Sequence, residues 1–305
     1  MRPGGDAMPT IHTELIGTIP CHCTLGEGPV WDERIGRLWW TDIQERRLHY
    51  WDWAERKSGW FDCPERLGSL GLTDDPAWLI CAFSSGFALF HPENAELRWL
   101  ARPEEAYRGI RFNDGRVDRQ GNFWAGSMVE DESLANGALG SLYRLTSDGA
   151  LTRLIEGIGI SNSIAWSPDG QWMWFADTTE GVIRRYAHDP NSGSLGVRVD
   201  FAHLPQGSSP DGSDVDAAGS LWNAEWGGSC LTCYAQDGPH RIALPVSQPT
   251  CIAFGGPALD HIFVTSAREG LDNEQLIAEP EAGNVLILKT SAIGLPAPKN
   301  PILQT

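Results

Sequence analysis

The sequence predicts an all-β protein with the fold of a six-bladed β-propeller. Three observations lead to this fold class: no long segment shows a sustained apolar repeat at helical spacing, glycine and tryptophan are abundant, and one aromatic-rich unit recurs along the chain. The 34 Gly among 305 residues indicate many tight turns, and the 14 Trp indicate large aromatics packed between strands. A β-rich chain of this length often folds as one domain.

The recurring unit is a turn with Gly or Asp, followed by a short strand rich in aromatic residues. Its six copies are IGRLWWTDI (35–43), DPAWLICAF (75–83), QGNFWAGSM (120–128), DGQWMWFAD (169–177), AGSLWNAEW (218–226) and LDHIFVTSA (259–267). Aligned on one apolar position in each strand, the copies recur at intervals of 40 to 49 residues. A unit of this length with several short strands is typical of a four-stranded propeller blade.

The two ends of the propeller are expected to meet in one blade. A strand near residues 11–18 should pair with NVLILKT at 284–290, because this pairing leaves no sheet edge open. We therefore expect a disordered leader over 1–10, a single propeller over 11–292 and a C-terminal tail over 293–305. A β-sandwich also has evenly spaced strands, but its Greek-key order gives no reason for so regular a repeat.

Charge and hydropathy exclude several classes of partner. The net charge of -17 and the pI near 4.8 argue against nucleic acid and anionic membranes, which require clustered Lys and Arg. The N-terminal residues contain no apolar core of signal-peptide length, and no run approaches the roughly 18 apolar residues that span a bilayer. We expect a cytoplasmic protein that is a monomer or a weak homo-oligomer.

The cysteines favour reduced thiols over a disulfide framework, because there are seven of them in a long chain. The pairs Cys21/Cys23 and Cys230/Cys233 are candidate half-sites for zinc. The first spacing is too short and no second CxxC is present, so buried small side chains are favoured over structural zinc.

The repeat also aligns four side chains that carry oxygen. Counting back eight or nine residues from the turn glycine of four repeats reaches Glu27, Asn113, Asn162 and Asp211. Equivalent positions on the innermost strands of a propeller face the central axis, so these side chains should converge at one end of the channel. The other two repeats carry Gly68 and Ile252 at this position, so a polar residue is not required by the repeat itself.

Four oxygen donors with two formal charges suit a hard divalent cation such as calcium, magnesium or manganese. The alternative is that Asn and Asp before Gly are ordinary turn residues. The motif SPDG occurs twice and separates the two interpretations: Asp169 falls in the turn of its repeat, whereas Asp211 falls eight residues before the turn glycine. We interpret Asp169 as a turn residue and Asp211 as axial.

A cationic side chain accompanies this set. Arg111 lies two residues before Asn113, on the same face of a strand, and should point into the mouth of the channel. There it would bind hydroxyl groups or stabilise an oxyanion; the alternative is a surface arginine in a salt bridge. The stretch VEDESLANG (129–137) follows a repeat strand at the same end and is a candidate lid. The motifs HExxH and GxSxG are absent, which disfavours zinc-protease and serine-triad chemistry.

Several stretches, in this order, resemble one known family: LGEGPVWD (25–32), RFNDGRVDRQGNFWAGSM (111–128), ISNSIAWSPDG (160–170) and PDGSDVDAAGSLWNAEWGG (210–228). The family is that of senescence marker protein, regucalcin and gluconolactonase, and the resemblance extends from about residue 14 to 290. It implies a six-bladed propeller that hydrolyses sugar lactones with one divalent cation in the channel, either Ca, Mg, Mn, Zn or Fe(II).

The resemblance also implies roles for individual residues. The family's metal ligands fall on Glu27, Asn162 and Asp211. Residues that contact metal-bound water or substrate fall on Arg111 and Asn113, and the acidic lid residue matches Asp131 best, with Glu130 adjacent. Where the family often has Gly after the middle Asn, this chain has Ser163.

The expected reaction is hydrolysis of a small sugar aldonolactone, of the gluconate, galactonate, arabinonate or xylonate type, to the aldonic acid. Asp211 is the expected catalytic residue, as acceptor of a proton from water, although a carboxylate bound to a metal is a weak base. Three alternatives stay open: a calcium-binding regulatory protein, a metal-dependent hydrolase of other esters or phosphotriesters, and a propeller that only binds other proteins.

Overall fold

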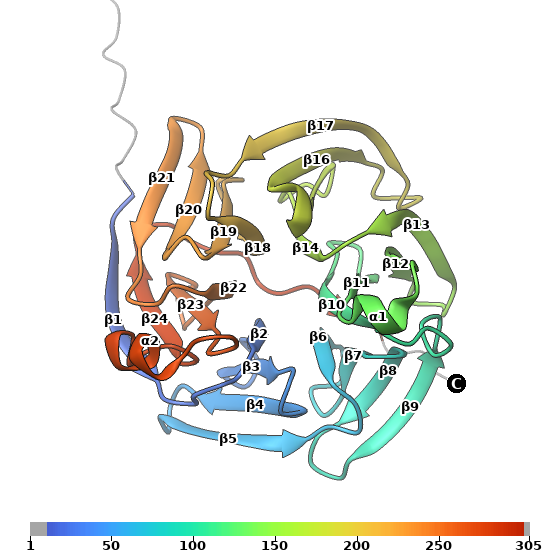
Figure 1. Cartoon of the computed structure of the whole chain (residues 1–305), viewed down its shortest axis with the longest axis horizontal. Coiled ribbons are helices and arrows are strands. Elements are labelled where there is room, and N and C mark those ends of the chain that lie inside the picture. The colour runs from blue at the N-terminus through green and yellow to red at the C-terminus, as the bar shows by residue number, and fades with distance from the viewer. Residues whose placement is uncertain (1–10, 302–305) are drawn as a thin grey trace, which may run out of the picture.

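The computed structural model describes residues 11–301 and shows six antiparallel sheets arranged around a central axis (Figure 1). Each sheet is one blade. In the five blades that are continuous in the chain the first strand lies innermost, whereas in the blade that joins the two ends of the chain the N-terminal strand lies outermost. The prediction of a six-bladed propeller is confirmed. The predicted leader, residues 1–10, lies outside the described residues.

The first three blades follow one another along the chain. The first contains β2 (Gly26–Asp32), β3 (Arg37–Asp42), β4 (Arg47–Asp52) and β5 (Lys57–Asp62). The second contains β6 (Leu67–Thr73), β7 (Leu79–Phe83), β8 (Gly86–His91) and β9 (Glu96–Ala101). The third contains β10 (Ile110–Val117), β11 (Phe123–Val129), β12 (Gly140–Leu145) and β13 (Leu151–Ile158).

The remaining blades complete the ring. The fourth contains β14 (Ser161–Trp166), β15 (Trp172–Asp177), β16 (Val182–His188) and β17 (Leu195–His203). The fifth contains β18 (Ser209–Val215), β19 (Leu221–Trp226), β20 (Cys230–Ala235) and β21 (Gly238–Ala243). The sixth contains β22 (Pro249–Gly255), β23 (His261–Ser266), β24 (Val285–Thr290) and β1 (Thr13–Ile19).

The sixth blade joins both ends of the propeller, as predicted. Strand β1 pairs antiparallel with β24, from Thr13 opposite Thr290 to Ile19 opposite Val285. This pairing closes the ring with hydrogen bonds: β24 is paired on both sides, by β23 and β1, and β1 is the outermost strand of the blade.

Helices are few and short. They are α1 (Glu132–Ala135), the 3-10 turn η1 (Thr178–Glu180) and α2 (Asn273–Ala278). Among the described residues, none of the helices is long and apolar enough to cross a membrane.

The recurring sequence unit forms the turn between the first two strands of each blade. In the third and fifth blades, a buried carboxylate fixes the turn and the following tryptophan together. The indole Nε1 of Trp124 donates to Asp118 over 2.7 Å, and that of Trp222 donates to Asp216 over 3.0 Å. The repeat of Asp and Trp therefore has a physical basis in a shared hydrogen bond.

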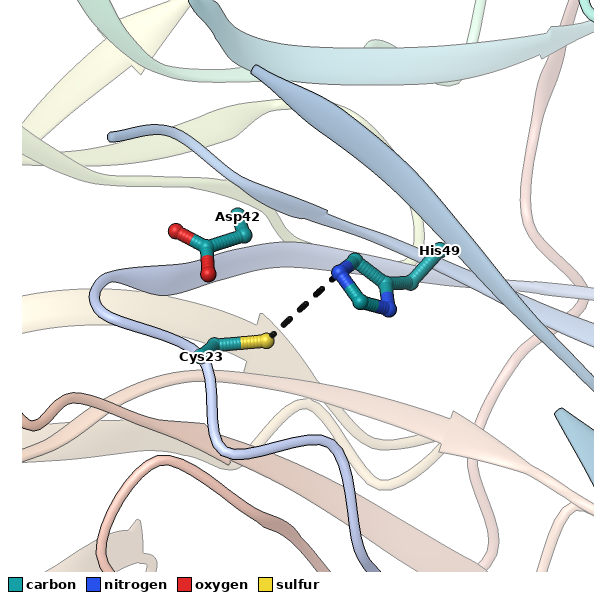
Figure 2. A group of neighbouring side chains, drawn as sticks. All are labelled: Cys23, Asp42 and His49. Atoms are coloured by element: carbon teal, nitrogen blue, oxygen red, sulfur yellow. Dashed lines mark hydrogen bonds between the residues drawn. The ribbon is translucent and has the colours of Figure 1, made fainter. Parts of the chain in front are cut away.

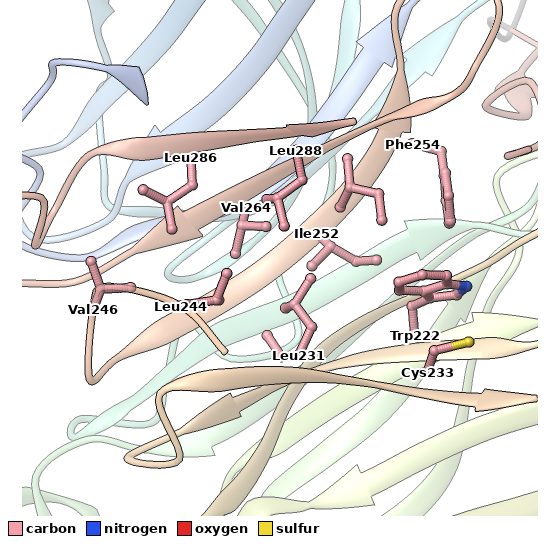
Figure 3. Packing of buried hydrophobic residues seen from close by; sticks show 12 residues of the cluster. Trp222, Leu231, Cys233, Leu244, Val246, Ile252, Phe254, Val264, Leu286 and Leu288 are labelled. Carbon is pink, nitrogen blue, oxygen red and sulfur yellow. The ribbon is translucent and has the colours of Figure 1, made fainter. Parts of the chain in front are cut away.

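Apolar side chains fill the spaces between blades. Figure 3 shows the cluster between the fifth and sixth blades, which includes Trp222, Leu231, Ile252, Phe254, Val264, Leu286 and Leu288. All of these are at most 3% exposed. Such burial stabilises the fold by roughly 25 cal/mol for each Å² of apolar surface.

Residues 293–301, which the sequence predicts as part of a tail, cross the end of the channel (Figure 1). We call this segment the C-terminal strap. The amide of Ala217 donates to Ile293 over 2.8 Å, and the short strand β25 (Lys299–Asn300) pairs in parallel with the end of β6. Residues 295–298 of the strap line a small cavity together with the last residues of inner strands, including Val117 and Trp166. The strap therefore covers the end of the channel opposite to the first residues of these strands.

Candidate functional site

The site begins with an irregularity that all six inner strands share. Each has a shift of register against the second strand of its blade, close to its own first residues. In four blades the shift contains or adjoins an aligned oxygen-bearing side chain: Glu27, Asn113, Asn162 and Asp211. A β-bulge changes the direction of the side chain at the bulge, which here turns these groups towards the channel.

The side chains meet in a cavity of about 260 Å³ at this end of the channel. The lining residues are Leu25, Glu27, Arg111, Asn113, Met128, Ile160, Asn162, Thr178, Asp211, Trp226 and Glu269. The four aligned residues and Arg111 are each at most 6% exposed. Residues up to 184 positions apart in the sequence thus share one buried polar wall.

The two carboxylates of this wall have few partners. Among residues 11–301, Asp211 Oδ1 is buried without a hydrogen-bond partner, and Glu27 Oε2 accepts the amide of Gly28 over 2.9 Å. Burial, and then the charge of Asp114, raises the pKa of Glu27 to about 8. Burial and then Glu27 raise the pKa of Asp211 well above its ordinary value. Two buried carboxyl groups that disfavour ionisation fit a bound divalent cation, which would balance their charge.

The asparagines supply neutral oxygens beside these carboxylates. Asn113 Nδ2 donates to Asn162 Oδ1 over 3.2 Å, and Asn162 Nδ2 donates to Thr178 Oγ1 over 2.8 Å. Thr178 in turn donates to the carbonyl of Pro210 over 2.8 Å. These bonds orient the Asn162 amide, and they connect the third, fourth and fifth blades around the cavity. Carboxylate and amide oxygens are the donor set that hard cations such as calcium prefer.

Arg111 reaches across the mouth of the cavity. Its NH1 donates to Asn113 Oδ1 over 2.7 Å, and its Nε donates to Glu130 Oε1 over 2.8 Å. Glu130 also pairs with Arg66 from the second blade, over 2.5 Å. The guanidinium is therefore held in place by two neighbours and belongs to the cavity, not to the outer surface.

The two acidic lid candidates lie in different environments. Asp131 is exposed and caps α1, where Oδ1 accepts the amides of Ser133 (2.9 Å) and Leu134 (3.2 Å). Neither Asp131 nor Glu130 is among the residues that line the cavity. Glu130 pairs with Arg111, which does line it, over 2.8 Å. Glu130 therefore contacts a residue of the site, whereas Asp131, which aligns best with the family pattern, caps α1.

Several lining residues were not predicted. Met128 is the last residue of its repeat unit, and Thr178 directly follows another unit, so the ends of these motifs carried a usable signal. Trp226, the last residue of a third unit, could line a pocket by its sequence position, although blade packing was favoured; it does line the cavity. Asp114, which directly follows Asn113, was not singled out in the sequence. It is buried beneath the cavity, where its Oδ2 accepts the amide of Ile164 over 2.8 Å.

Ser163 adopts a backbone conformation that normally favours glycine. Its φ is 63°, close to the 54° of Gly28 at the equivalent position of the first blade. The hydroxyl of Ser163 lies 2.6 Å from that of Ser213, which ties the fourth blade to the fifth. The family's frequent Gly at this position fits the left-handed backbone, and the serine hydrogen bond offsets part of the strain here.

Fold and cavity together define a six-bladed propeller with a buried, oxygen-lined pocket suited to a divalent cation. The chain belongs to the SMP-30/gluconolactonase/LRE-like family, because the sequence model of this family matches residues 25–268. The family resemblance inferred from the sequence is thereby confirmed.

Individual relatives are similar over most of their length. The chain is 38% identical to L-arabinolactonase from Azospirillum brasilense, over 89% of this chain and 90% of the relative. It is 34% identical to 6-deoxy-6-sulfogluconolactonase from Pseudomonas putida, over 90% and 94%. The crystal structure of regucalcin from Agrobacterium tumefaciens, described as a calcium-binding protein, superposes with a TM-score of 0.87 at 33% identity and covers 93% of this chain and 97% of that one.

Proposed function

We propose that this protein hydrolyses a small sugar aldonolactone to the aldonic acid, assisted by one divalent cation held by Glu27, Asn162 and Asp211. The observation that carries the proposal is the unpartnered Asp211 Oδ1, buried beside Glu27 in a cavity of about 260 Å³. The relatives named as lactonases support the reaction class.

The dimensions and walls of the cavity favour a small ring. Ligand pockets commonly measure about 300–1,000 Å³, so this one suits a single five- or six-membered lactone better than a larger ester. The lining contains both kinds of side chain: Leu25, Met128, Ile160 and Trp226 are apolar, and the remaining residues are polar or charged. A mixed lining of this kind can contact both the hydroxyls and the carbon atoms of a sugar ring.

The cation would act as a Lewis acid on the lactone carbonyl and lower the pKa of a nearby water molecule. Arg111 and Asn113 would bind ring oxygens and hold the carbonyl in position. Asp211 would accept a proton as the water oxygen bonds to the carbonyl carbon. The ring C–O bond then breaks, and the proton passes to the oxygen that leaves, which gives the open-chain hydroxy acid.

A calcium-binding regulatory role is the second candidate, since regucalcins are also among the relatives. It requires the same oxygen ligands but no substrate pocket. The apolar residues in the cavity lining favour the enzyme, because a site that only binds an ion does not need them.

The two SPDG motifs provide a matched test of the site. Asp211→Ala should lower kcat/KM for a lactone at least about 100-fold, since loss of groups that merely support a metal site already costs 10–100-fold. Binding of Ca²⁺ should weaken in parallel. The control is Asp169→Ala, because Asp169 only accepts local bonds from Ser167 and Gln171. Full activity of Asp211→Ala would refute the proposal.

A further inference from the structure

A second group of metal-binding side chains lies in the first blade, outside the channel cavity. Cys23, Asp42 and His49 approach one another so that their ligand atoms all lie within 4.8 Å (Figure 2). Cys23 precedes β2, Asp42 ends β3 and His49 lies in β4. All three are at most 5% exposed.

The spacing of the sulfur and the nitrogen matches a tetrahedral metal site. With Zn–S near 2.3 Å and Zn–N near 2.0–2.1 Å, two tetrahedral ligands lie about 3.6 Å apart. Cys23 Sγ and His49 Nε2 are 3.9 Å apart, so a shift of a few tenths of an ångström would suffice. A direct S–H···N hydrogen bond at this distance is weak, so it does not by itself explain why the thiol and the imidazole face each other.

The surrounding groups hold each candidate ligand in position. The Asp42 carboxylate accepts the amides of Thr24 over 2.8 Å, Leu25 over 3.2 Å and Glu45 over 3.4 Å. The ring of His49 is stacked on Trp40, with centroids 5.2 Å apart and planes inclined by 19°. Burial lowers the pKa of His49 to about 4, so the imidazole is neutral at physiological pH, as a metal ligand must be.

We propose that Cys23, Asp42 and His49 form a second cation site of the zinc type, independent of the site in the channel. A thiolate and a carboxylate together would carry two negative charges, which match a divalent ion. Binding would release the Cys23 proton to solvent, since the thiolate is the ligand. The mixed sulfur, nitrogen and oxygen donors favour zinc-class ions over calcium or magnesium, which take oxygen alone.

Cys21, two residues before Cys23, is a neighbouring thiol that is only partly buried. Its Sγ donates to the carbonyl of Gly283 over 3.2 Å, and it is not one of the three residues whose ligand atoms all lie within 4.8 Å of one another. A water molecule would therefore complete the coordination of the ion. A nucleophilic role for Cys23 is disfavoured, because the residue is only 1% exposed and a substrate does not reach its sulfur.

Such an ion would also stabilise the approach to the channel cavity. The amides of Thr24 and Leu25 are bound to Asp42, and Leu25 itself lines the cavity two residues before Glu27. The second site would therefore fix the segment that leads into the channel ligand, with no contact to the substrate.

The test is a titration of the chelator-treated, thiol-reduced full chain with Co²⁺. Co²⁺ bound by a thiolate has an intense charge-transfer absorption in the near ultraviolet, whereas oxygen ligands give none. We expect this band to saturate at one Co²⁺ per chain in the wild type and in Asp211→Ala. Cys23→Ser should lose it. The matched control is Cys233→Ser, because Cys233 is another buried thiol, packed in the apolar cluster of Figure 3.

His49→Gln should retain all thiols and weaken the Co²⁺ affinity at least about 10-fold. The absence of a thiolate band in the wild type would overturn the proposal, whatever the variants do. A band of undiminished intensity in folded Cys23→Ser would overturn it as well. Because lactone turnover is not the readout, failure here is distinct from failure of the proposed channel chemistry.

Discussion

At the scale of single residues, Gly26 and Gly28, on either side of Glu27, are required for different physical reasons. A Cβ on Gly26 would lie 2.8 Å from the carbonyl oxygen of Ser266, so this position has no room for a side chain. Gly28 has a φ of 54°, which the bulge requires and which most residues adopt only with strain. Close packing on one side and a left-handed backbone on the other thus turn Glu27 into the channel.

The buried Glu27 carboxyl should make the metal-free protein sensitive to pH. Its pKa in the folded chain is about 8, against an ordinary value of 4.5. A raised pKa contributes stability that is complete below pH 4.5 and is lost as the pH rises through 8. The Tm of chelator-treated protein should therefore fall by several degrees between pH 5 and pH 8, and Ca²⁺ should reverse the loss.

Glu27→Gln checks the cause of this effect. The amide does not ionise, so the fall in Tm should be clearly shallower in the chelated variant, and Ca²⁺ should raise its Tm much less. Differential scanning fluorimetry at several pH values measures both effects. A variant whose Tm falls as steeply as that of the wild type would show that Glu27 is not the titrating group.

At the scale of elements, the two acidic residues after β11 have different roles. Asp131 caps α1, whereas Glu130 pairs with Arg111. Asp131→Ala removes the cap of α1 and should cost about 1 kcal/mol of local stability, with little change in kcat/KM. Glu130→Gln removes the ion-pair partner of Arg111 and should raise KM about tenfold, because the guanidinium loses its fixed orientation.

Steady-state kinetics on both variants separates these expectations, and thermal unfolding provides the structural control. The reverse order, with a large loss of activity in Asp131→Ala and none in Glu130→Gln, would assign the lid role to Asp131, which the family pattern favours.

The repeat predicted the inner-strand positions well because it arises from backbone pairing, which is the same in every blade. From this regularity the sequence predicted that Asn113, Asn162 and Asp211 lie at one level of the channel, and all three line the same cavity. The pairing of Glu130 with Arg66 was not predictable in this way, because it depends on the path of loops that have no counterpart in other blades. The sequence named Cys21/Cys23 as a candidate half-site for zinc and favoured buried thiols instead. It did not connect Cys23 with Asp42 and His49, because these residues occupy positions that are not equivalent in the repeat.

At the scale of the whole molecule, the ring of blades is closed by β1. The C-terminal strap covers the end of the channel that lies opposite to the cavity. The pairing of β1 was predicted from the need to close the ring, whereas the path of the strap was not, since PAPKNP carries no strand pattern. Its anchors are single hydrogen bonds to distant blades, such as that from Asn300 Nδ2 to the carbonyl of Gly121 over 2.6 Å.

Ending the chain at Ala292 should therefore destabilise the protein without removing its chemistry. The loss of several hydrogen bonds at about 1 kcal/mol each predicts a decrease in Tm on the order of 5 °C or more. Below the lowered Tm, kcat/KM should stay within about threefold of the wild type, because the strap lies at the end of the channel opposite to the cavity. Loss of activity in a folded truncation would contradict this separation.

The most direct test of the central claim is acid release from a panel of five- and six-membered aldonolactones. Chelator-treated protein is assayed alone and with added Ca²⁺, Mg²⁺, Mn²⁺, Zn²⁺ or Fe²⁺, against the spontaneous rate of each lactone. We predict little turnover without metal and restored turnover with at least one ion, lost again in Asp211→Ala. No turnover with any metal, despite measurable binding of the ion in the channel, would contradict the lactonase function and favour the regulatory alternative.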